Sequence, residues 1–128
     1  MVSQPALIIL DHGSREPAAN ALVMQIVSRV KIRRPDSIVE PAHMELASPS
    51  LDEAVSACQN QGAQSIAVLP YFLAPGRHTQ ETIPQQVAEI AKRYPGLDIR
   101  IAEPLGCHDS LVDLLLDRAE ALGESFGR

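Results

Sequence analysis

The chain has 128 residues, which is enough for one domain with a hydrophobic core. Its composition of 45% apolar and 21% charged residues excludes a disordered or fibrous protein. The net charge of −5, without a stripe of lysine and arginine, excludes a nucleic-acid-binding protein. Only 3% of residues are aromatic, so the core is expected to be aliphatic, as in parallel strands buried on both faces.

The cellular setting is indicated by segments that the sequence lacks. No stretch approaches the roughly 20 apolar residues that cross a bilayer, so we expect no membrane-spanning helix. The apolar stretch 6–10 has no basic segment before it and no small-residue cleavage site after it. These features predict a cytoplasmic protein. Cys58 and Cys107 form neither a CxxC pair nor a disulfide framework, and Cys58 is expected to be a small buried side chain.

Apolar patterning along the chain alternates between short runs and helical periodicity. The predicted strands are 6–10, 37–44, 65–69 and 97–102. The predicted helices are about 16–33, Ser48 to Gly62, about 79–93 and 110–122. Pro41 weakens the second strand because proline cannot donate a ladder hydrogen bond.

Proline and glycine residues mark where several predicted helices begin and end. Ser48 is expected to cap the second helix, with Pro49 at its first position and Gly62 just past its end. Pro84 lies inside the third helical pattern. This helix is therefore expected to begin near Pro84, after an irregular turn.

Four successive strand-helix units predict a single α/β domain over residues 1–128. Right-handed crossovers then give a doubly wound parallel sheet in strand order 2-1-3-4, with helices on both faces. In such sheets ligands bind beyond the carboxyl ends of the strands, where the strand order reverses. We therefore expect the functional site beyond the first and third strands.

Three loops at this edge carry potential metal ligands, namely His12, Glu45 and His78. Successive members of the set are 33 residues apart, about the length of one strand-helix unit, so each returns to the same edge. Two imidazoles and a carboxylate suit Co²⁺, Fe²⁺, Ni²⁺ or Zn²⁺ and leave coordination positions open. The alternatives are that the histidines cap turns and that Glu45 precedes a helix N-terminus.

Four motifs in chain order resemble the CbiX/SirB-type sirohydrochlorin chelatases. The segment Leu10–Arg15 (LDHGSR) resembles their HGSR turn, and Glu45–Ser50 (ELASPS) resembles their E-x-A-x-P-S run. Residues 70–84 resemble their P-x-F-L-x-x-G-x-H-x-x-x-D-I-P signature, and Pro104–Gly106 resembles their P-L-G. The ordered set covers almost the whole chain, so it is far more specific than HGS alone.

The resemblance implies a flavodoxin-like, chelatase-type fold and a lyase that inserts Co²⁺ or Fe²⁺, with Ni²⁺ as a third metal, into sirohydrochlorin. It places the metal on His12, Glu45 and His78, with no organic cofactor, in cobalamin or siroheme biosynthesis. His12 and His78 would also act as catalytic bases, since neutral imidazole accepts protons near neutral pH. A short chain of this family is expected to work as a homodimer. The family has Asp where this chain has Thr82. If that Asp supports the histidine, its loss would alter metal preference or rate, and the neighbouring Glu81 is the candidate substitute.

Sirohydrochlorin carries eight carboxylates, so an acidic chain must concentrate positive charge locally. Arg15 and Arg77 lie beside predicted ligands and are candidate substrate-binding residues, with solvated loop charges as the alternative. His43 is expected to point away from Glu45, and His108 to begin the last helix.

Two other functions compete with the chelatase assignment. A tetrapyrrole or metal carrier of the same fold would keep the site but lack turnover. A hydrolase using His12 and Ser14 is disfavoured, because the sequence has no G-x-S-x-G elbow.

Overall fold

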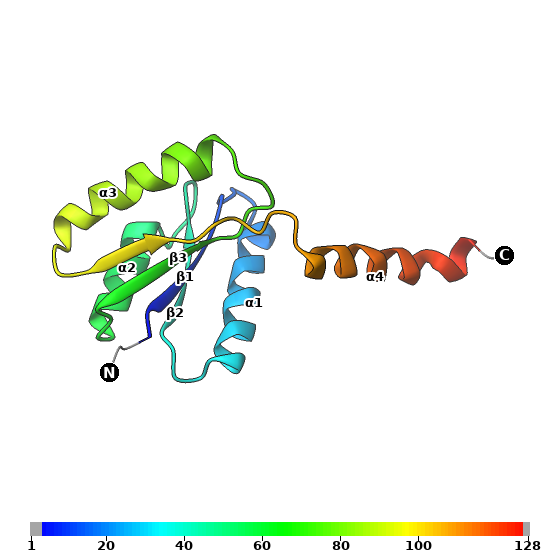
Figure 1. Cartoon of the computed structure of the whole chain (residues 1–128), viewed down its shortest axis with the longest axis horizontal. Helices are drawn as coiled ribbons and strands as arrows, with labels where there is room; N and C mark the ends of the chain where they lie inside the picture. Colours follow the sequence, from blue (N-terminus) through cyan, green and yellow to red (C-terminus); the bar gives the residue numbers. More distant parts are fainter. Residues whose placement is uncertain (1–3, 127–128) are drawn as a thin grey trace.

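The computed structural model describes residues 4–126, without the side chains of residues 78, 79 and 124–126. Strands and helices alternate through this range (Figure 1). The order is β1 (Ala6–Asp11), α1 (Pro17–Arg33), β2 (Val39–His43), α2 (Leu51–Asn60), β3 (Ser65–Pro70), η1 (His78–Thr82), α3 (Ile83–Arg93), β4 (Asp98–Ile101) and α4 (Asp109–Phe126). Each predicted strand and helix is present, with ends shifted by a few residues.

The strands form one parallel sheet in the order β2-β1-β3-β4, which confirms the predicted topology. Strand order reverses at β1, so β1 pairs with both β2 and β3. Pro41 lies in β2, at the edge of the sheet, where a residue without an N–H is tolerated. The carboxyl ends of β1, β2 and β3 therefore lie side by side.

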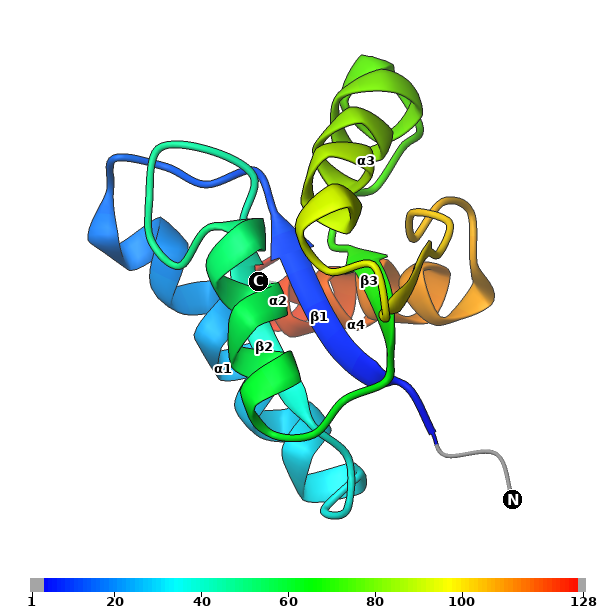
Figure 2. The same cartoon turned by 90° about the vertical axis from the view of Figure 1, so that its left-hand side faces the viewer.

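Helices cover the two faces of the sheet unequally. Helices α2 and α3 pack on one face and α1 on the other, and Figure 2 shows α2 in front of the sheet. The larger core lies under α2 and α3 and includes Ile8, Leu10, Val55, Val68 and Ile83. The smaller core lies under α1 and consists of Ile9, Val23, Val27 and Val39.

Cys58 is fully buried on α2, as expected. Burial raises the pKa of its thiol to about 12, so this cysteine is an inert core residue.

The start of α2 differs from the prediction. Ser50, and not Ser48, is the N-cap, because Ser50 Oγ accepts from Glu53 N at 3.1 Å. The Glu53 carboxylate in turn accepts from Ser50 N at 3.0 Å, which completes a capping box and lowers the pKa of Glu53. Pro49 lies outside the helix because its carbonyl accepts from His43 N at 2.8 Å.

Two other predicted helix boundaries are confirmed, and α4 ends four residues later than predicted. Gly62 follows the end of α2 with a φ of +96°, as expected of a glycine at that position. The irregular turn predicted before Pro84 is the π-helical segment η1, after which α3 begins at Ile83.

Helix α4 extends away from the sheet and its other helices (Figure 1). His108 precedes it as predicted, and His108 Nδ1 accepts from Ser110 N at 3.0 Å, which caps its first turn. Within residues 4–126, no helix combines the length and apolarity that crossing a bilayer requires.

Candidate functional site

The three predicted ligand positions lie at the carboxyl edge of the sheet. His12 follows β1, Glu45 follows β2, and His78 opens η1 after the loop that leaves β3. Among the side chains that the structure describes, no three His, Cys, Asp or Glu residues form a metal-binding group, and the His78 side chain lies outside them. The fold thus brings the three loops to one edge, while the ligand set itself stays a prediction.

His12 lies against an aromatic side chain that the core holds in place. The imidazole stacks on Phe72, with ring centroids 4.1 Å apart and an angle of 8° between the planes. Phe72 is 7% exposed and belongs to the larger core, whereas His12 is exposed. The stack sets the plane of an imidazole that still faces solvent, which suits a residue that must meet a ligand.

Backbone hydrogen bonds join the His12 loop to the Glu45 loop. Met44 N donates to Asp11 O at 2.9 Å, and Glu45 N donates to His12 O at 3.1 Å. Gly13 has a φ of +86°, and a Cβ at this position would lie 1.8 Å from the carbonyl oxygen of Glu45. Only glycine permits this approach. The contact of Gly13 with Glu45 joins residues far apart in the chain, and the glycine of the HGSR turn was the one signal of it in the sequence.

A His–Asp pair with a buried imidazole joins the ends of β1 and β2, just before these two loops. His43 Nδ1 is 2.5 Å from Asp11 Oδ1, and the His43 side chain is 2% exposed. His43 is therefore a buried residue, one of the two positions, core or surface, expected of a histidine that is not a ligand. Its partner Asp11 was missed, because the register that sets Asp11 opposite His43 is visible only in the sheet. The pair ties the residue before His12 to the strand that leads to Glu45.

The loop after Gly13 is bonded to the first turns of α1. Asn20 Oδ1 accepts from Ser14 N at 2.9 Å, and Asn20 Nδ2 donates to Ser14 O at 2.7 Å. The Ser14 hydroxyl accepts from Glu16 N at 3.0 Å. Ser14 therefore organises the turn.

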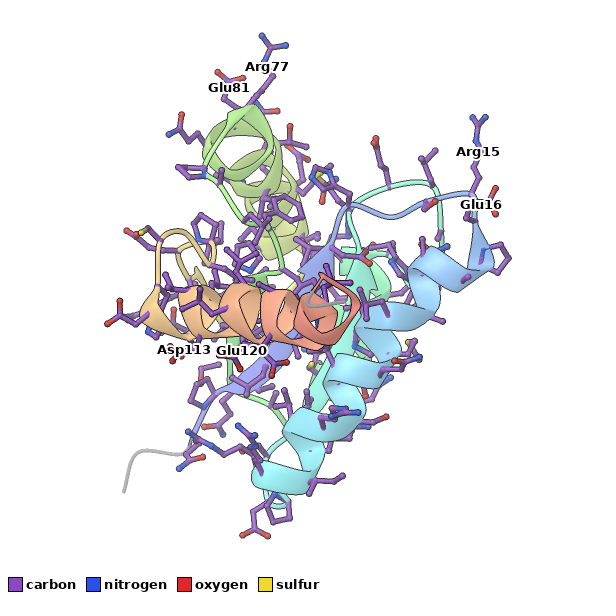
Figure 3. All side chains as sticks on the ribbon, turned by 90° about the vertical axis from the view of Figure 1, so that its right-hand side faces the viewer. Arg15, Glu16, Arg77, Glu81, Asp113 and Glu120 are labelled. Atoms are coloured by element: carbon purple, nitrogen blue, oxygen red, sulfur yellow. The ribbon has the colours of Figure 1, made fainter. Side chains whose placement is uncertain are left out.

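The two candidate substrate-binding arginines stand at the tips of separate loops. Figure 3 shows Arg15 and Arg77 pointing away from the body of the protein, each with an acidic neighbour labelled beside it. Arg77 Nε lies 3.8 Å from Glu81 Oε2, and both side chains are mostly exposed, at 83% and 64%. Such a pair is weak, so the guanidinium can exchange Glu81 for an incoming carboxylate.

A cavity of about 420 Å³ opens beside His12. It combines the imidazole, the apolar loop residues Phe72 and Leu73, and the cation Arg77. Phe72 contributes to both the core and this wall, whereas its neighbour Leu73 is exposed and contributes to the wall alone. The combination suits a flat apolar molecule with carboxylate substituents.

Thr82 lies on a different surface from this cavity. It lines a groove of about 390 Å³ between α2 and α3, together with Met44, Ser50 and Gln86. Gln86 Nε2 donates to Met44 O at 3.1 Å across this groove. Glu81, the residue that could replace the family's Asp, is exposed and faces Arg77.

Comparisons with known proteins show which family the chain belongs to. The sequence model of CbiX matches residues 6–122. The chloroplastic sirohydrochlorin ferrochelatase of Arabidopsis thaliana is 45% identical over 114 residues, covering 89% of this chain and 51% of the relative. The sirohydrochlorin cobaltochelatase of Methanocaldococcus jannaschii is 32% identical over 147 residues, covering 96% of this chain and 99% of the relative.

The fold also matches a solved structure that contains iron. SirB from Bacillus subtilis with Fe³⁺ superposes with a TM-score of 0.87 at 28% identity, covering 94% of this chain and 48% of SirB. The chain spans about half the length of SirB and of the Arabidopsis relative, and nearly all of the Methanocaldococcus relative.

Proposed function

Because the chain belongs to the CbiX family, we propose that it is a sirohydrochlorin chelatase, a lyase that inserts Co²⁺ or Fe²⁺ and accepts Ni²⁺ as a third metal. The observation that carries the proposal is agreement over nearly the whole chain with relatives named sirohydrochlorin ferrochelatase and cobaltochelatase. The metal is a substrate of this reaction, and the reaction uses no organic cofactor. The domain responsible extends over residues 1–128.

The proposed chemistry uses the residues at the carboxyl edge. His12, Glu45 and His78 bind the divalent metal and present it to the macrocycle. Metal insertion releases two pyrrole protons. Transfer of the metal to the macrocycle frees the ligating ring nitrogens of His12 and His78, which then accept these protons, since a neutral imidazole is a good base near neutral pH. The stack of His12 on Phe72 supports this role because it holds the ring in one plane at the cavity wall.

Binding of the tetrapyrrole combines apolar contact with charge. The cavity beside His12 offers Phe72 and Leu73 to the face of the macrocycle. Arg15 and Arg77 contact peripheral carboxylates, and their exposed positions on separate loops suit a substrate charged around its rim.

We further propose a homodimer, with the tetrapyrrole between two copies, and a cytoplasmic location. One cavity of about 420 Å³ forms one wall for a macrocycle, and a second copy would supply the other. The pathway is cobalamin or siroheme synthesis, and the metal preference distinguishes them. An anaerobic competition between Co²⁺, Fe²⁺ and Ni²⁺ for sirohydrochlorin measures that preference.

The proposal is tested by the visible spectrum of sirohydrochlorin under anaerobic conditions. Purified protein with Co²⁺ or Fe²⁺ should accelerate the spectral change, and His78→Ala and His12→Ala should each lose most of the acceleration. His108→Asn is the matched control, because His108 is an exposed histidine that caps α4 and asparagine keeps the capping acceptor. An unchanged rate in His78→Ala, or tight binding of sirohydrochlorin without turnover by the native protein, would contradict a chelatase.

A further inference from the structure

Leu46, the residue after the predicted ligand Glu45, has a backbone conformation that leucine rarely adopts. Its φ is +69°, and among the described residues it is the one residue other than glycine with a positive φ. In this left-handed region the Cβ crowds the backbone, so glycine, asparagine and aspartate are its usual occupants. Such strain persists where the surrounding structure imposes it, and it is concentrated at functional sites.

The backbone just before this leucine is held by three contacts. Glu45 N donates to His12 O at 3.1 Å, and Gln86 Nε2 on α3 donates to Met44 O at 3.1 Å. The Glu45 carbonyl oxygen lies so close to the backbone of Gly13 that a Cβ there would be 1.8 Å away. The peptide groups on both sides of Glu45 are therefore fixed, and they set the direction in which the chain enters the next residue.

The backbone after Leu46 is anchored as well. Pro49 O accepts from His43 N at 2.8 Å, which ties the segment back to β2. The Ser48 hydroxyl donates to the Glu53 carboxylate at 3.0 Å, which ties the segment to the first turn of α2. Anchors on both sides leave only a short link in which the chain can turn. The positive φ of Leu46 is therefore imposed by the fold.

The imposed turn requires a positive φ, but it does not require leucine. Glycine or asparagine would make the same turn with less strain. The Leu46 side chain is 57% exposed and belongs to neither core, so it adds little to the packing of the domain. An apolar side chain thus stands where both the backbone and the solvent disfavour it. This combination indicates a contact with another molecule.

Leu46 lies across the His12 loop from the cavity wall. Strand β1 lies between β2 and β3, so the loops that follow β2 and β3 flank His12. Leu46 is on the first of these loops, and Leu73, which is 68% exposed, is on the second. Figure 2 shows the loop between β2 and α2 on one side of the end of β1, with α3 on the other. The loops are two strand spacings apart, about 10 Å, which is similar to the width of a tetrapyrrole macrocycle.

Each of the two leucines has a cation nearby. Arg15 is exposed on the loop that is bonded to the Leu46 loop, and Arg77 is exposed on the same loop as Leu73. Figure 3 shows Arg15 and Arg77 at the tips of their loops, well apart from one another. An apolar residue and a cation are thus repeated on both sides of His12. The repeat matches a flat molecule with an apolar face and carboxylates around its rim.

We propose that Leu46 is a second apolar contact for the tetrapyrrole, which rests on Leu46 and Leu73 with His12 between them. This inference deepens the proposed function and rests on it. Binding of the macrocycle removes the exposed Leu46 side chain from water, so the side chain strengthens substrate binding and contributes little to folding. The fixed turn holds this apolar contact directly beside the predicted ligand Glu45.

Leu46→Asn separates substrate contact from folding, because asparagine accepts the left-handed conformation and removes the apolar contact. Metal-free protein is titrated with sirohydrochlorin under anaerobic conditions, and the fluorescence of the tetrapyrrole measures the affinity. We expect binding to be roughly tenfold weaker than in the native protein, since a partly exposed aliphatic side chain is lost from the contact. The variant should unfold at the same urea concentration as the native protein or at a higher one. Calorimetry with Co²⁺ alone should give equal affinities for the two proteins.

Two further variants are the matched controls. Leu46→Met keeps an apolar side chain of similar volume on the same backbone, so it should retain most of the affinity for sirohydrochlorin. Ile32→Asn makes a similar change at a side chain that is 79% exposed near the end of α1, away from the carboxyl edge. It should bind sirohydrochlorin as the native protein does.

Four results would overturn the contact. They are native affinity for sirohydrochlorin in Leu46→Asn, an equal loss of affinity in Leu46→Met, weakened binding of Co²⁺ alone by Leu46→Asn, and a loss that light scattering traces to dissociation of an oligomer. The third result would make Leu46 a support for Glu45, and the fourth would place it between two copies of the chain. A native protein that does not bind sirohydrochlorin contradicts the proposed function as well as the contact, so the two failures are distinguishable.

Discussion

The two halves of the carboxyl edge are built differently. The loops after β1 and β2 are joined by two backbone hydrogen bonds, a close approach at Gly13 and the Asp11–His43 pair. The segment after β3 instead presents exposed side chains, with Arg77 and Glu81 in a long, solvated pair. One half resembles a protein core and the other a surface.

The difference separates two tasks within one site. In the proposed function, the bonded half holds the His12 and Glu45 loops together for metal binding. The exposed half would present Arg77 and Leu73 to a large anionic substrate. Changes to the contacts of the bonded half should therefore lower stability and activity together, while changes in the exposed half should alter substrate binding alone.

Gly13→Ala is expected to have the largest effect. The new Cβ would lie 1.8 Å from Glu45 O at a positive φ, so the two loops must separate. The free energy of unfolding should fall by about 3 kcal/mol or more, and chelation should be lost. Urea unfolding and the spectral assay measure both. Gly76→Ala is the control, because no heavy atom lies within 4 Å of its added Cβ. Equal stability of the two variants would contradict the close approach.

His43→Ala should have the next largest effect. It leaves the Asp11 carboxylate without its buried partner and opens a cavity, which should cost about 2–3 kcal/mol. We expect a lower kcat as well, because the pair supports the residue next to His12. Lys92→Ala, which breaks an exposed pair with Glu89, is the control and should cost less than about 1 kcal/mol. A His43→Ala protein as stable as this control would show that the pair has no structural role.

Ser50→Ala should produce a smaller loss of stability. It removes the acceptor for Glu53 N at the start of α2, and N-caps are typically worth about 1 kcal/mol. Thermal unfolding measures the change. Ser28→Ala on the exposed face of α1 is the control, with an expected change within about 0.5 kcal/mol. If Ser48→Ala destabilised the protein more than Ser50→Ala, the sequence-based position of the cap would be correct after all.

Arg77→Gln should leave stability nearly unchanged, because its pair with Glu81 is exposed and long. We expect KM for sirohydrochlorin to rise several-fold with little change in kcat, and the rise to shrink in high salt, which screens exposed charges. Lys92→Gln controls for the loss of one positive charge elsewhere. An equal KM in both variants would remove Arg77 from the substrate-binding surface.

Much of the site could be predicted from the sequence because the repeat length brings residues 33 positions apart back to one edge. His12 and Glu45 are where this argument placed them. Asp11 could not be found as the partner of His43, since the pairing depends on the register between β1 and β2. The cap of α2 was placed two residues early, because the bond from His43 N to Pro49 O draws that segment toward the sheet. The need for glycine at position 13 also could not be predicted, because it comes from the close approach of the Glu45 carbonyl, which is distant in the sequence.

By itself, the sequence determined the order of strands and helices, the parallel sheet and the edge that carries the chemistry. These properties follow from local periodicity and from chain connectivity, which act within one strand-helix unit. The tertiary structure alone decided the bonded half of the site, the groove that Thr82 lines and the direction of α4. Each of these depends on contacts between residues far apart in the chain. The apolar period of 110–122 predicted a helix correctly, but a period specifies that a face must be buried and not what buries it.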